Sequence, residues 1–528
     1  MSVMAYMPFG ASGIIIRVEA DIRRGIPGID ITGLAEGAVR EARERVRAAF
    51  RNSGFNFPQD RILINLAPAG MKKDGAALDL PIALSVMAAA GIAPVSGNLL
   101  VMGELELSGK IRPVRGVLSA IASGLAEGIT EFIVPAENAK EAAILSKSGI
   151  NSKKKAIFTA AENLQEAVHA LFIREEKGAL PASLETLTSD EDTSLSLNCG
   201  DFAEVRGQVV YKRALEIAAA GGHNALVFGP PGAGKTMLAR RLPSIMAPLS
   251  PDEAIEVTRL HSLAGSHNSG FIDRLITDPP FRAPHHTASA EGILGGGRIP
   301  RPGEISLAHY GVLFFDEAPE YRINVLQALR EPLEDKIISI SRAEGPVRLP
   351  ADFQLLMTAN SCRCGRLGIP ETEHACLCSP EEINRYWRKF SGALLDRVEI
   401  RTAVLPPKTE DMSSNKQGNE EKSAEINRRV KAAVEIQRQR YKKPGIRRNA
   451  LIPAGKTAGF CPLNEKAESA FHKAISKLGL SGRAYHGILR VARTIADLEG
   501  KDIIEIEHIL EAVHHRRLGE DPWEILSI

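Results

Sequence analysis

The sequence predicts an α/β multidomain protein in three parts: an N-terminal α/β domain, a second domain built on a parallel sheet, and a helical C-terminal domain. The chain has 528 residues, several times the length of one domain. Runs of β-branched residues alternate with helical stretches along much of it. Two polar segments divide it, which gives domains at 1–172, 200–405 and 426–528, a linker at 173–199 and a polar loop at 406–425.

The composition, 44% hydrophobic and 25% charged, is that of a globular protein and excludes a disordered or disulfide-stapled chain. The 66 Lys and Arg residues nearly balance 64 Asp and Glu residues, so any nucleic-acid surface must be a local patch. No secretory signal is visible at 1–13, and the apolar run 80–95 is too short and proline-broken to span a membrane. We therefore expect a cytoplasmic protein that has no membrane partner.

In the first domain, β-branched runs predict strands at 14–20 and 61–66, and apolar positions at helical spacing predict helices at 37–50 and 81–90. In the second domain, a P-loop follows the apolar strand 225–228 and opens a helix. Its glycines let backbone N–H groups surround an anion at a helix N-terminus. The predicted ATP ligands are Gly229, Pro230, Pro231, Gly232, Ala233, Gly234, Lys235 and Thr236, with Thr236 also binding Mg²⁺.

A second strand, 312–315, ends in two carboxylates at the edge where ligands bind in α/β sheets. We expect Asp316 to hold Mg²⁺ and Glu317 to polarise the attacking water. A third apolar strand precedes Asn360, whose amide is suited to orienting that water. Arg397 follows a short helix, where it suits the γ-phosphate of an adjacent subunit. Alone, such an arginine is more often a surface ion-pair partner, but the order of the four motifs favours the catalytic interpretation.

Four cysteines follow Asn360 on one predicted loop: Cys362, Cys364, Cys376 and Cys378. Four thiolates suit a tetrahedral Zn²⁺ ion and leave no open position for a catalytic water, so we expect a structural zinc site. The spacing within each pair is tighter than is usual for zinc, and free buried cysteines are the alternative.

Basic residues gather in three segments that suit DNA phosphates. The Gly/Pro-rich segment 292–303 predicts an exposed, flexible loop, 337–349 predicts a β-hairpin, and 428–448 is rich in Lys and Arg. In a ring, the loop and the hairpin could line the pore, although each of these arginines taken alone is more often a solvated surface residue. The candidates for DNA contacts are Arg298, Arg301, Arg342, Arg348, Arg438, Lys442, Lys443, Arg447 and Arg448. No base-reading motif is visible, so recognition should depend on DNA structure and backbone.

These motifs together resemble the magnesium-chelatase-like branch of the AAA+ ATPases, and within it the ComM/YifB competence-protein family. The segments that carry the resemblance beside the P-loop are 201–208, 218–224, 281–289, 295–297 and 302–309. The resemblance implies an AAA+ core with a helical lid, in which Asn360 is sensor 1 and Arg397 an arginine finger acting on the neighbour. It implies sensor 2 at Arg483, with Arg490 as the alternative.

The same resemblance implies a homo-hexameric ATPase that binds branched or single-stranded DNA. Members of the family drive branch migration, a helicase activity, in homologous recombination and in the integration of transforming DNA, with recombination proteins as further partners. A magnesium-chelatase-like motor subunit that remodels a protein partner is the alternative function.

The first domain resembles the proteolytic domain of Lon, an α/β fold of the ribosomal-protein-S5 type. The matching segments are 68–70, 73–75 and 103–116. A Lon-type enzyme uses a serine activated by a lysine, yet these positions fall on Ala77 and Leu118. The sequence therefore predicts no protease activity and favours a recognition or assembly role for this domain.

Overall fold

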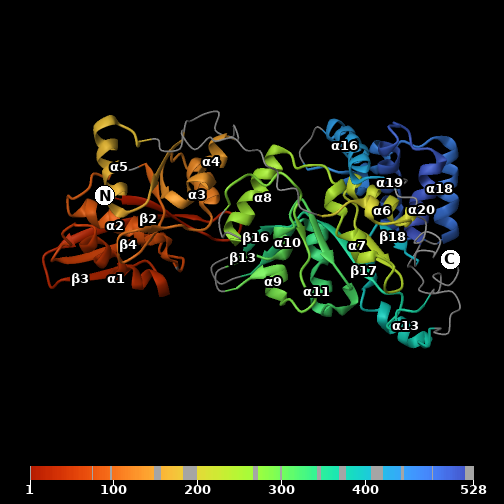
Figure 1. The fold of residues 1–528 in the computed structure, drawn as a ribbon, viewed down its shortest axis with the longest axis horizontal. Helices are drawn as coiled ribbons and strands as arrows, with labels where there is room; N and C mark the ends of the chain where they lie inside the picture. Colours follow the sequence, from red (N-terminus) through yellow and green to blue (C-terminus); the bar gives the residue numbers. More distant parts are fainter. Residues whose placement is uncertain are drawn as a thin grey trace.

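The computed structural model describes residues 2–73, 75–95, 98–147, 156–181, 199–265, 272–297, 300–341, 346–367, 376–405, 420–441, 445–478 and 480–517. These residues form an N-terminal region on a mixed sheet, a core on a parallel sheet, and a helical C-terminal region (Figure 1). The three regions follow one another along the long axis of the molecule, with the core in the middle. The predicted α/β multidomain class is confirmed.

The N-terminal region contains a seven-stranded sheet of order β3-β4-β2-β1-β5-β8-β9. Its strands are β1 (Ser2–Met7), β2 (Ile14–Arg23), β3 (Gly28–Thr32), β4 (Arg61–Ala67), β5 (Leu99–Val101), β8 (Glu131–Pro135) and β9 (Ile157–Ala161). The pairs β1–β2 and β2–β4 are antiparallel and the other neighbours are parallel. A separate antiparallel pair joins β6 (Glu104–Leu105) to β7 (Ile111–Arg112). Strands β2 and β4 confirm the two strands that the sequence predicts.

The helices of this region are α1 (Gly37–Asn52), α2 (Asp79–Ala89), α3 (Val117–Ala126), α4 (Ala139–Lys147) and α5 (Leu164–Lys177). Helices α1 and α2 confirm the two predicted helices. Helix α2 packs on β1 and β2 and is buried from Asp79 to Ala88, as its almost uninterrupted apolar sequence suggests. Helix α5 continues five residues past the predicted boundary at 172, and most of the predicted linker lies outside the described residues.

The core sheet is entirely parallel and has the order β11-β14-β17-β10-β18. Its strands are β10 (Ala225–Phe228), β11 (Phe281–Arg282), β14 (Val312–Phe315), β17 (Gln354–Ala359) and β18 (Ile400–Ala403). Every residue of β10, β14 and β17 is buried, as apolar runs predict for strands covered on both faces. Strand β17 lies between β10 and β14, so three neighbouring strands deliver the P-loop, Asn360 and the paired carboxylates to one edge.

The core helices are α6 (Val209–Gly221), α7 (Lys235–Ala239), α8 (Pro251–Ala264), α9 (Ala290–Leu294), α10 (Glu304–Leu307), α11 (Ile323–Ala328), α12 (Arg330–Asp335), α13 (Pro380–Trp387) and α14 (Gly392–Leu395). Strands β15 (Ile337–Ile340) and β16 (Val347–Pro350) pair antiparallel and confirm the predicted hairpin.

The segment 292–303 differs from the predicted flexible loop, because β12 (Gly295–Gly296) and β13 (Arg301–Pro302) form an antiparallel ribbon after α9. Glycine makes this pairing possible: a Cβ on Gly303 would lie 2.2 Å from the backbone nitrogen of Gly295.

The C-terminal region consists of α16 (Ser423–Arg440), α17 (Thr457–Phe460), α18 (Glu465–Leu478), α19 (Gly482–Leu498) and α20 (Ile506–Arg517). Helix α16 begins inside the segment predicted as a polar loop, because its first residue, Ser423, packs against the core. Ser423 is buried, and its hydroxyl accepts the N–H of Phe202 at 2.8 Å. Across the described ranges, no helix combines the length and apolar character that crossing a membrane requires.

Among the described residues, two contacts join the N-terminal region to the core. Helix α3 packs against α8, and the turn between β1 and β2 packs against the β15–β16 hairpin. At the turn, a Cβ on Gly10 would lie 2.8 Å from Cγ1 of Val347, so the two segments are in close contact. Val347 pairs with Ile340 next to the hairpin turn, so the N-terminal region lies against the turn end of the hairpin predicted to reach DNA.

Candidate functional site

The P-loop connects the C-terminal end of β10 to α7. Gly232 and Gly234 adopt φ angles of 78° and 81°, left-handed values that favour glycine. Gly229 is needed for a different reason, since a Cβ there would lie 2.0 Å from the carbonyl oxygen of Val404. The loop is thus folded tightly against β18, with the N-terminus of α7 beginning at Lys235.

Lys235 lies in the middle of this loop. Its Nζ donates to the carbonyl oxygens of Gly229 and Pro230, both at 2.8 Å, and to Oδ1 of Asn360 at 3.2 Å. Burial lowers the pKa of Lys235 to about 8, and the nearby carboxylates of Asp316 and Glu317 partly oppose this shift. Phosphate oxygens would be stronger acceptors than the neutral carbonyls that hold the ammonium group here.

Three oxygen-bearing side chains meet beside the lysine. The hydroxyl of Thr236 donates to Oδ1 of Asp316 at 2.8 Å, and the hydroxyl of Thr358 donates to the same atom at 2.6 Å. Thr358 in turn accepts the N–H of Glu317 at 2.9 Å. Carboxylate and hydroxyl oxygens are ligands that Mg²⁺ prefers. The structure therefore brings the residues predicted for ATP, Mg²⁺ and water activation to one edge of the sheet.

Sequence reasoning missed three residues of this site. Thr358 is one, and the only signal for it is a hydroxyl within an otherwise apolar strand, two positions before Asn360. Gln208 has a φ of 55°, and its Nε2 donates to the carbonyl oxygens of Ala233 at 3.2 Å and Leu405 at 2.8 Å. The buried hydroxyl of Tyr211 donates to the carbonyl oxygen of Lys235 at 2.9 Å. Nothing in the spacing of the motifs points to either residue.

Arg397 lies at the opposite edge of the sheet. Its carbonyl oxygen accepts from Nδ2 of Asn224 at 2.8 Å, and Asn224 directly precedes β10. The four residues of β10 rise about 13 Å before the P-loop begins. Arg397 therefore lies at the N-terminal ends of the strands, whereas a nucleotide on the P-loop of the same chain would lie at their C-terminal ends.

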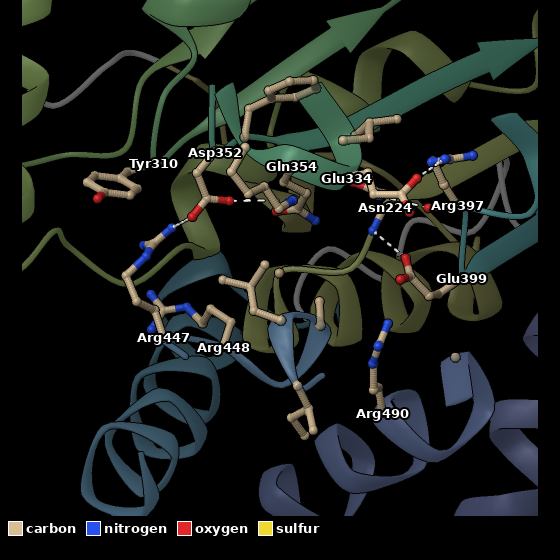
Figure 2. Close-up of a pocket in the computed structure, with 18 of the residues that line it drawn as sticks. Asn224, Tyr310, Glu334, Asp352, Gln354, Arg397, Glu399, Arg447, Arg448 and Arg490 are labelled. Carbon is tan, nitrogen blue, oxygen red and sulfur yellow. Dashed lines mark hydrogen bonds and ion pairs between the residues drawn. The ribbon is translucent and has the colours of Figure 1, made fainter. Parts of the chain in front are cut away.

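Arg483, at the start of α19, lies beside Arg397. Both guanidiniums pair with Glu334 of α12, Arg397 through Oε2 and Arg483 through Oε1 at 3.2 Å (Figure 2 shows the first pair). The predicted arginine finger and the predicted sensor 2 arginine thus share one carboxylate, away from the P-loop of their own chain.

A cavity of about 560 Å³ lies next to this pair, between the N-terminal edge of the sheet and the C-terminal region (Figure 2). Asn224, Gln354 and Glu399 line it from the core, and Arg448 and Arg490 line it from the C-terminal region. Burial lowers the pKa of Arg448 to about 10. This cavity is separate from the ATP site, which lies at the other edge.

Arg447 does not belong to a DNA surface in this structure, contrary to the sequence prediction. Its guanidinium pairs with Glu253 of α8 and with Asp352, and lies 3.8 Å from the ring centroid of Tyr310 (Figure 2). It is therefore committed to joining the C-terminal region to the core. Its neighbour Arg448 lines the cavity rather than an open surface.

Three other DNA candidates are exposed: Arg301 on the β12–β13 ribbon, Arg348 on the β15–β16 hairpin, and Arg438 on α16, which donates to the carbonyl oxygen of Pro248 at 3.1 Å. The candidates outside the described residues are Arg298, Arg342, Lys442 and Lys443. Arg301 on the ribbon and Arg348 on the hairpin are therefore accessible to a DNA backbone, as the sequence prediction requires.

The four clustered cysteines come together. Cys362 Sγ lies 3.3 Å from Cys364 Sγ and 3.6 Å from Cys376 Sγ, and the four sulfurs, Cys378 included, lie within 4.8 Å of one another. A tetrahedral zinc site with Zn–S bonds of about 2.3 Å places its sulfurs about 3.8 Å apart, so the cluster fits zinc.

The cysteine cluster is joined to the ATP site. Cys362 is buried and follows Asn360 by two residues. The carbonyl oxygen of Ser361 between them accepts from Nε1 of Trp387 at 3.0 Å. A Cβ on Gly365 would lie 2.7 Å from Cδ of Pro231 in the P-loop. A metal held here would therefore fix the chain on both sides of the nucleotide pocket.

The two positions of the missing Lon-type dyad contain no catalytic group. Leu118 is fully buried, and its N–H donates to Oε1 of Glu141 at 3.3 Å. Glu141 also accepts from the hydroxyl of Ser262 on α8 and from Nδ2 of Asn138 at 2.9 Å, and burial raises the pKa of this carboxyl. The lysine position has thus become part of the contact between the N-terminal region and the core.

Comparisons with known proteins agree with this architecture. A family model described as magnesium chelatase, subunit ChlI, matches residues 201–412. Models for subunit ChlI of Mg-chelatase and for the ChlI C-terminal part match residues 18–138 and 420–516. The competence protein ComM of Haemophilus influenzae is 39% identical over 96% of both chains. YifB of Salmonella typhimurium is 40% identical over 96% of this chain and 95% of its own. A Lon protease of Heliobacterium modesticaldum is 26% identical over 36% of this chain and 24% of its own.

Proposed function

This chain belongs to the ChlI-like family of magnesium-chelatase-type AAA+ ATPases, with ComM and YifB as full-length homologues, and we propose that it is an ATP-driven ring motor that moves branched DNA. The observation that carries the proposal is the division of the ATP chemistry between two edges of one sheet. A motor that needs its neighbour's arginines must work as an assembly of several copies.

Within one subunit, Lys235 would bind the β- and γ-phosphates, and Thr236 and Asp316 would hold Mg²⁺. Bound Mg²⁺ would offset the negative charge that builds up on the phosphates. Glu317 would take a proton from the attacking water while Asn360 holds that water in line. Thr358 would orient both carboxylates, because its hydroxyl contacts Asp316 and the backbone of Glu317.

Between subunits, Arg397 and Arg483 would contact the γ-phosphate bound to the next copy. This assignment is supported by their place at the sheet edge opposite the P-loop. An arginine supplied from a neighbour is worth about 10³- to 10⁵-fold in rate in related phosphoryl transfer. Arg397→Ala should therefore bind ATP without hydrolysing it, and mixing it with Lys235→Ala should restore part of the activity. Normal turnover by Arg397→Ala alone would refute the trans assignment.

DNA is the proposed substrate because exposed arginines lie on the β12–β13 ribbon, on the β15–β16 hairpin and on α16. Arg301 and Arg348 would contact backbone phosphates from the ribbon and the hairpin, and Arg438 would extend the surface. The name of ComM, a competence protein, supports action on transforming DNA during homologous recombination. We expect a homo-hexamer on branched or single-stranded DNA, with recombination proteins as further partners.

The Cys362, Cys364, Cys376 and Cys378 cluster is proposed to hold structural Zn²⁺, since its geometry fits a tetrahedral thiolate site. The N-terminal region is proposed to be an assembly element without protease activity, because Ala77 and Leu118 provide neither nucleophile nor base.

The test is ATP-dependent dissociation of a labelled Holliday or three-strand junction, with Lys235→Ala and Glu317→Gln as controls. Dissociation that both substitutions abolish would support the DNA motor. The second candidate is remodelling of a protein partner, favoured by the three matches to magnesium chelatase subunit ChlI. Hydrolysis that DNA does not stimulate, with no junction movement, would favour this second function.

A further inference from the structure

Glu334 occupies a position that the hydrolytic mechanism does not use. It lies on α12 with 52% of its side chain exposed, at the sheet edge opposite the P-loop. Its carboxylate oxygens are divided between two arginines, Arg397 from the core and Arg483 from the C-terminal region. One side chain therefore joins both arginines that are placed to meet a neighbour's nucleotide, and it links two regions of the chain.

This pairing determines where the arginines point. Arg397 is held twice, since its Nη1 donates to the carbonyl oxygen of Ala393 at 2.6 Å while its Nη2 meets Glu334. The guanidinium of Arg397 holds the pKa of the Glu334 carboxyl below its usual value, and Arg483 adds to this effect. Glu334 is therefore ionised at neutral pH and carries a full negative charge beside the two cations.

A neighbour's γ-phosphate would compete with this carboxylate for the same N–H donors. The carboxylate would also repel the phosphate as it approaches. Ion pairs this exposed contribute little, roughly a factor of two to five each in an equilibrium. A triphosphate that accepts hydrogen bonds from both guanidiniums can therefore displace Glu334. A neighbouring site without nucleotide has no phosphate oxygens that could replace the carboxylate.

We propose that Glu334 is a latch that occupies Arg397 and Arg483 until the nucleotide on a second copy of this chain displaces it. The partner is a nucleotide-loaded copy of the same protein, so this inference rests on the proposed ring function. The latch makes contact between subunits depend on nucleotide in the neighbouring site. It also releases α19 from α12 when the contact forms, since Arg483 is the lid arginine that Glu334 holds.

Glu334→Gln keeps the shape of the side chain and removes its charge. Glu331→Gln is the matched control: Glu331 lies on the same helix, is exposed, and has no ion pair with any described residue. The measurement is the protein concentration at half-assembly with Mg²⁺ and a slowly hydrolysed ATP analogue, by sedimentation velocity or mass photometry.

Glu334→Gln should assemble at a protein concentration about four- to twenty-five-fold lower than wild type, because two weak ion pairs no longer have to be broken. Glu331→Gln should stay within about twofold of wild type. Without nucleotide, the Glu334→Gln advantage should disappear, and it should also disappear when Arg397 and Arg483 are both replaced by alanine. Thermal unfolding of each variant checks that it is folded, and Glu334→Ala provides a second variant if glutamine disturbs the helix.

Unchanged or weaker assembly of Glu334→Gln would overturn the latch. If Glu334 only positioned the arginines, its loss would weaken assembly instead of strengthening it. Gain of the same size without nucleotide would also overturn it. Wild-type protein that stays monomeric at every nucleotide concentration would refute the proposed ring itself, and the latch with it. The two failures are distinguishable because the second appears in wild type.

Discussion

Replacing Thr358 by valine should slow ATP hydrolysis strongly while changing nucleotide affinity little. The side chain of Thr358 is 1% exposed, and its hydroxyl joins Asp316 Oδ1 at 2.6 Å to the N–H of Glu317 at 2.9 Å. Valine has nearly the same shape but no hydroxyl. The substitution therefore leaves the N–H of Glu317 without this acceptor and removes one of the two hydroxyls that hold Asp316.

The size of the effect follows from these two bonds. A buried polar group left without its partner costs about 1–3 kcal/mol, and two groups are affected, so the free energy of unfolding should fall by roughly 2–6 kcal/mol. If about 1.4–2.7 kcal/mol of this is lost from the transition state, kcat falls about ten- to hundredfold. Thr236 still holds Asp316 from the P-loop side, so KM for MgATP should rise less than about threefold.

Steady-state ATPase titrations and chemical denaturation measure the two quantities separately. Thr358→Ser keeps the hydroxyl and should restore most of kcat. Thr402→Val on β18 is the control, because among the described residues the hydroxyl of this buried threonine has one side-chain partner, Nδ1 of His515 at 3.5 Å. A Thr358→Val protein with kcat within twofold of wild type would show that Thr358 does not orient the carboxylates. Equal losses in both variants would mean that general destabilisation explains the effect.

Raising the pH through about 8 should weaken MgATP binding, because Lys235 loses its proton there in the nucleotide-free protein whereas bound phosphates favour its protonated form. The Kd for MgATP should rise by up to about tenfold per pH unit. Calorimetry should detect proton uptake on binding, and Lys235→Arg should lack it. Cys362→Ser should lose bound zinc in elemental analysis and lower the melting temperature, whereas zinc retained at the wild-type level would exclude the Cys₄ site. Arg447→Ala should lower the free energy of unfolding by about 3 kcal/mol without changing DNA affinity, as removal of one partner from a largely buried ion pair predicts. Arg348→Ala should leave the free energy of unfolding unchanged but weaken DNA binding. In a binding titration, the slope of log affinity against log salt concentration should fall by about one unit.

The ATP site could be predicted because each of its motifs is a short run of contiguous residues. The P-loop requires a strand, a glycine-rich turn and a helix in that order, and each is recognisable from eight or so neighbouring residues. The carboxylates and Asn360 each follow a run of apolar residues, and parallel strands must bring such ends to one edge. The strand order β14-β17-β10 and the supporting side chains of Thr358, Gln208 and Tyr211 came only from the structure.

The remaining contacts could not be predicted because they join residues far apart in the chain. Arg447 pairs with Glu253 and Asp352, and no local pattern distinguishes this half-buried arginine from its basic neighbours on a solvated surface. Glu334 meets Arg397 and Arg483 from two different regions, so its role depends on how the C-terminal helices pack on the core. Charge density along the sequence predicted a surface at 428–448, but packing decided which of its charges remained exposed.

Helix α8 gives the N-terminal region a physical connection to the rest of the motor. At its first turn, Glu253 pairs with Arg447 of the C-terminal region, and at its last turn Ser262 donates to the buried Glu141 of the N-terminal region. The helix has 14 residues and is therefore about 21 Å long. Because both ends are tied by buried polar contacts, movement of the C-terminal region against the core must either carry α8 along or break one of them. The N-terminal region is thus placed to respond to movements of the C-terminal region through α8.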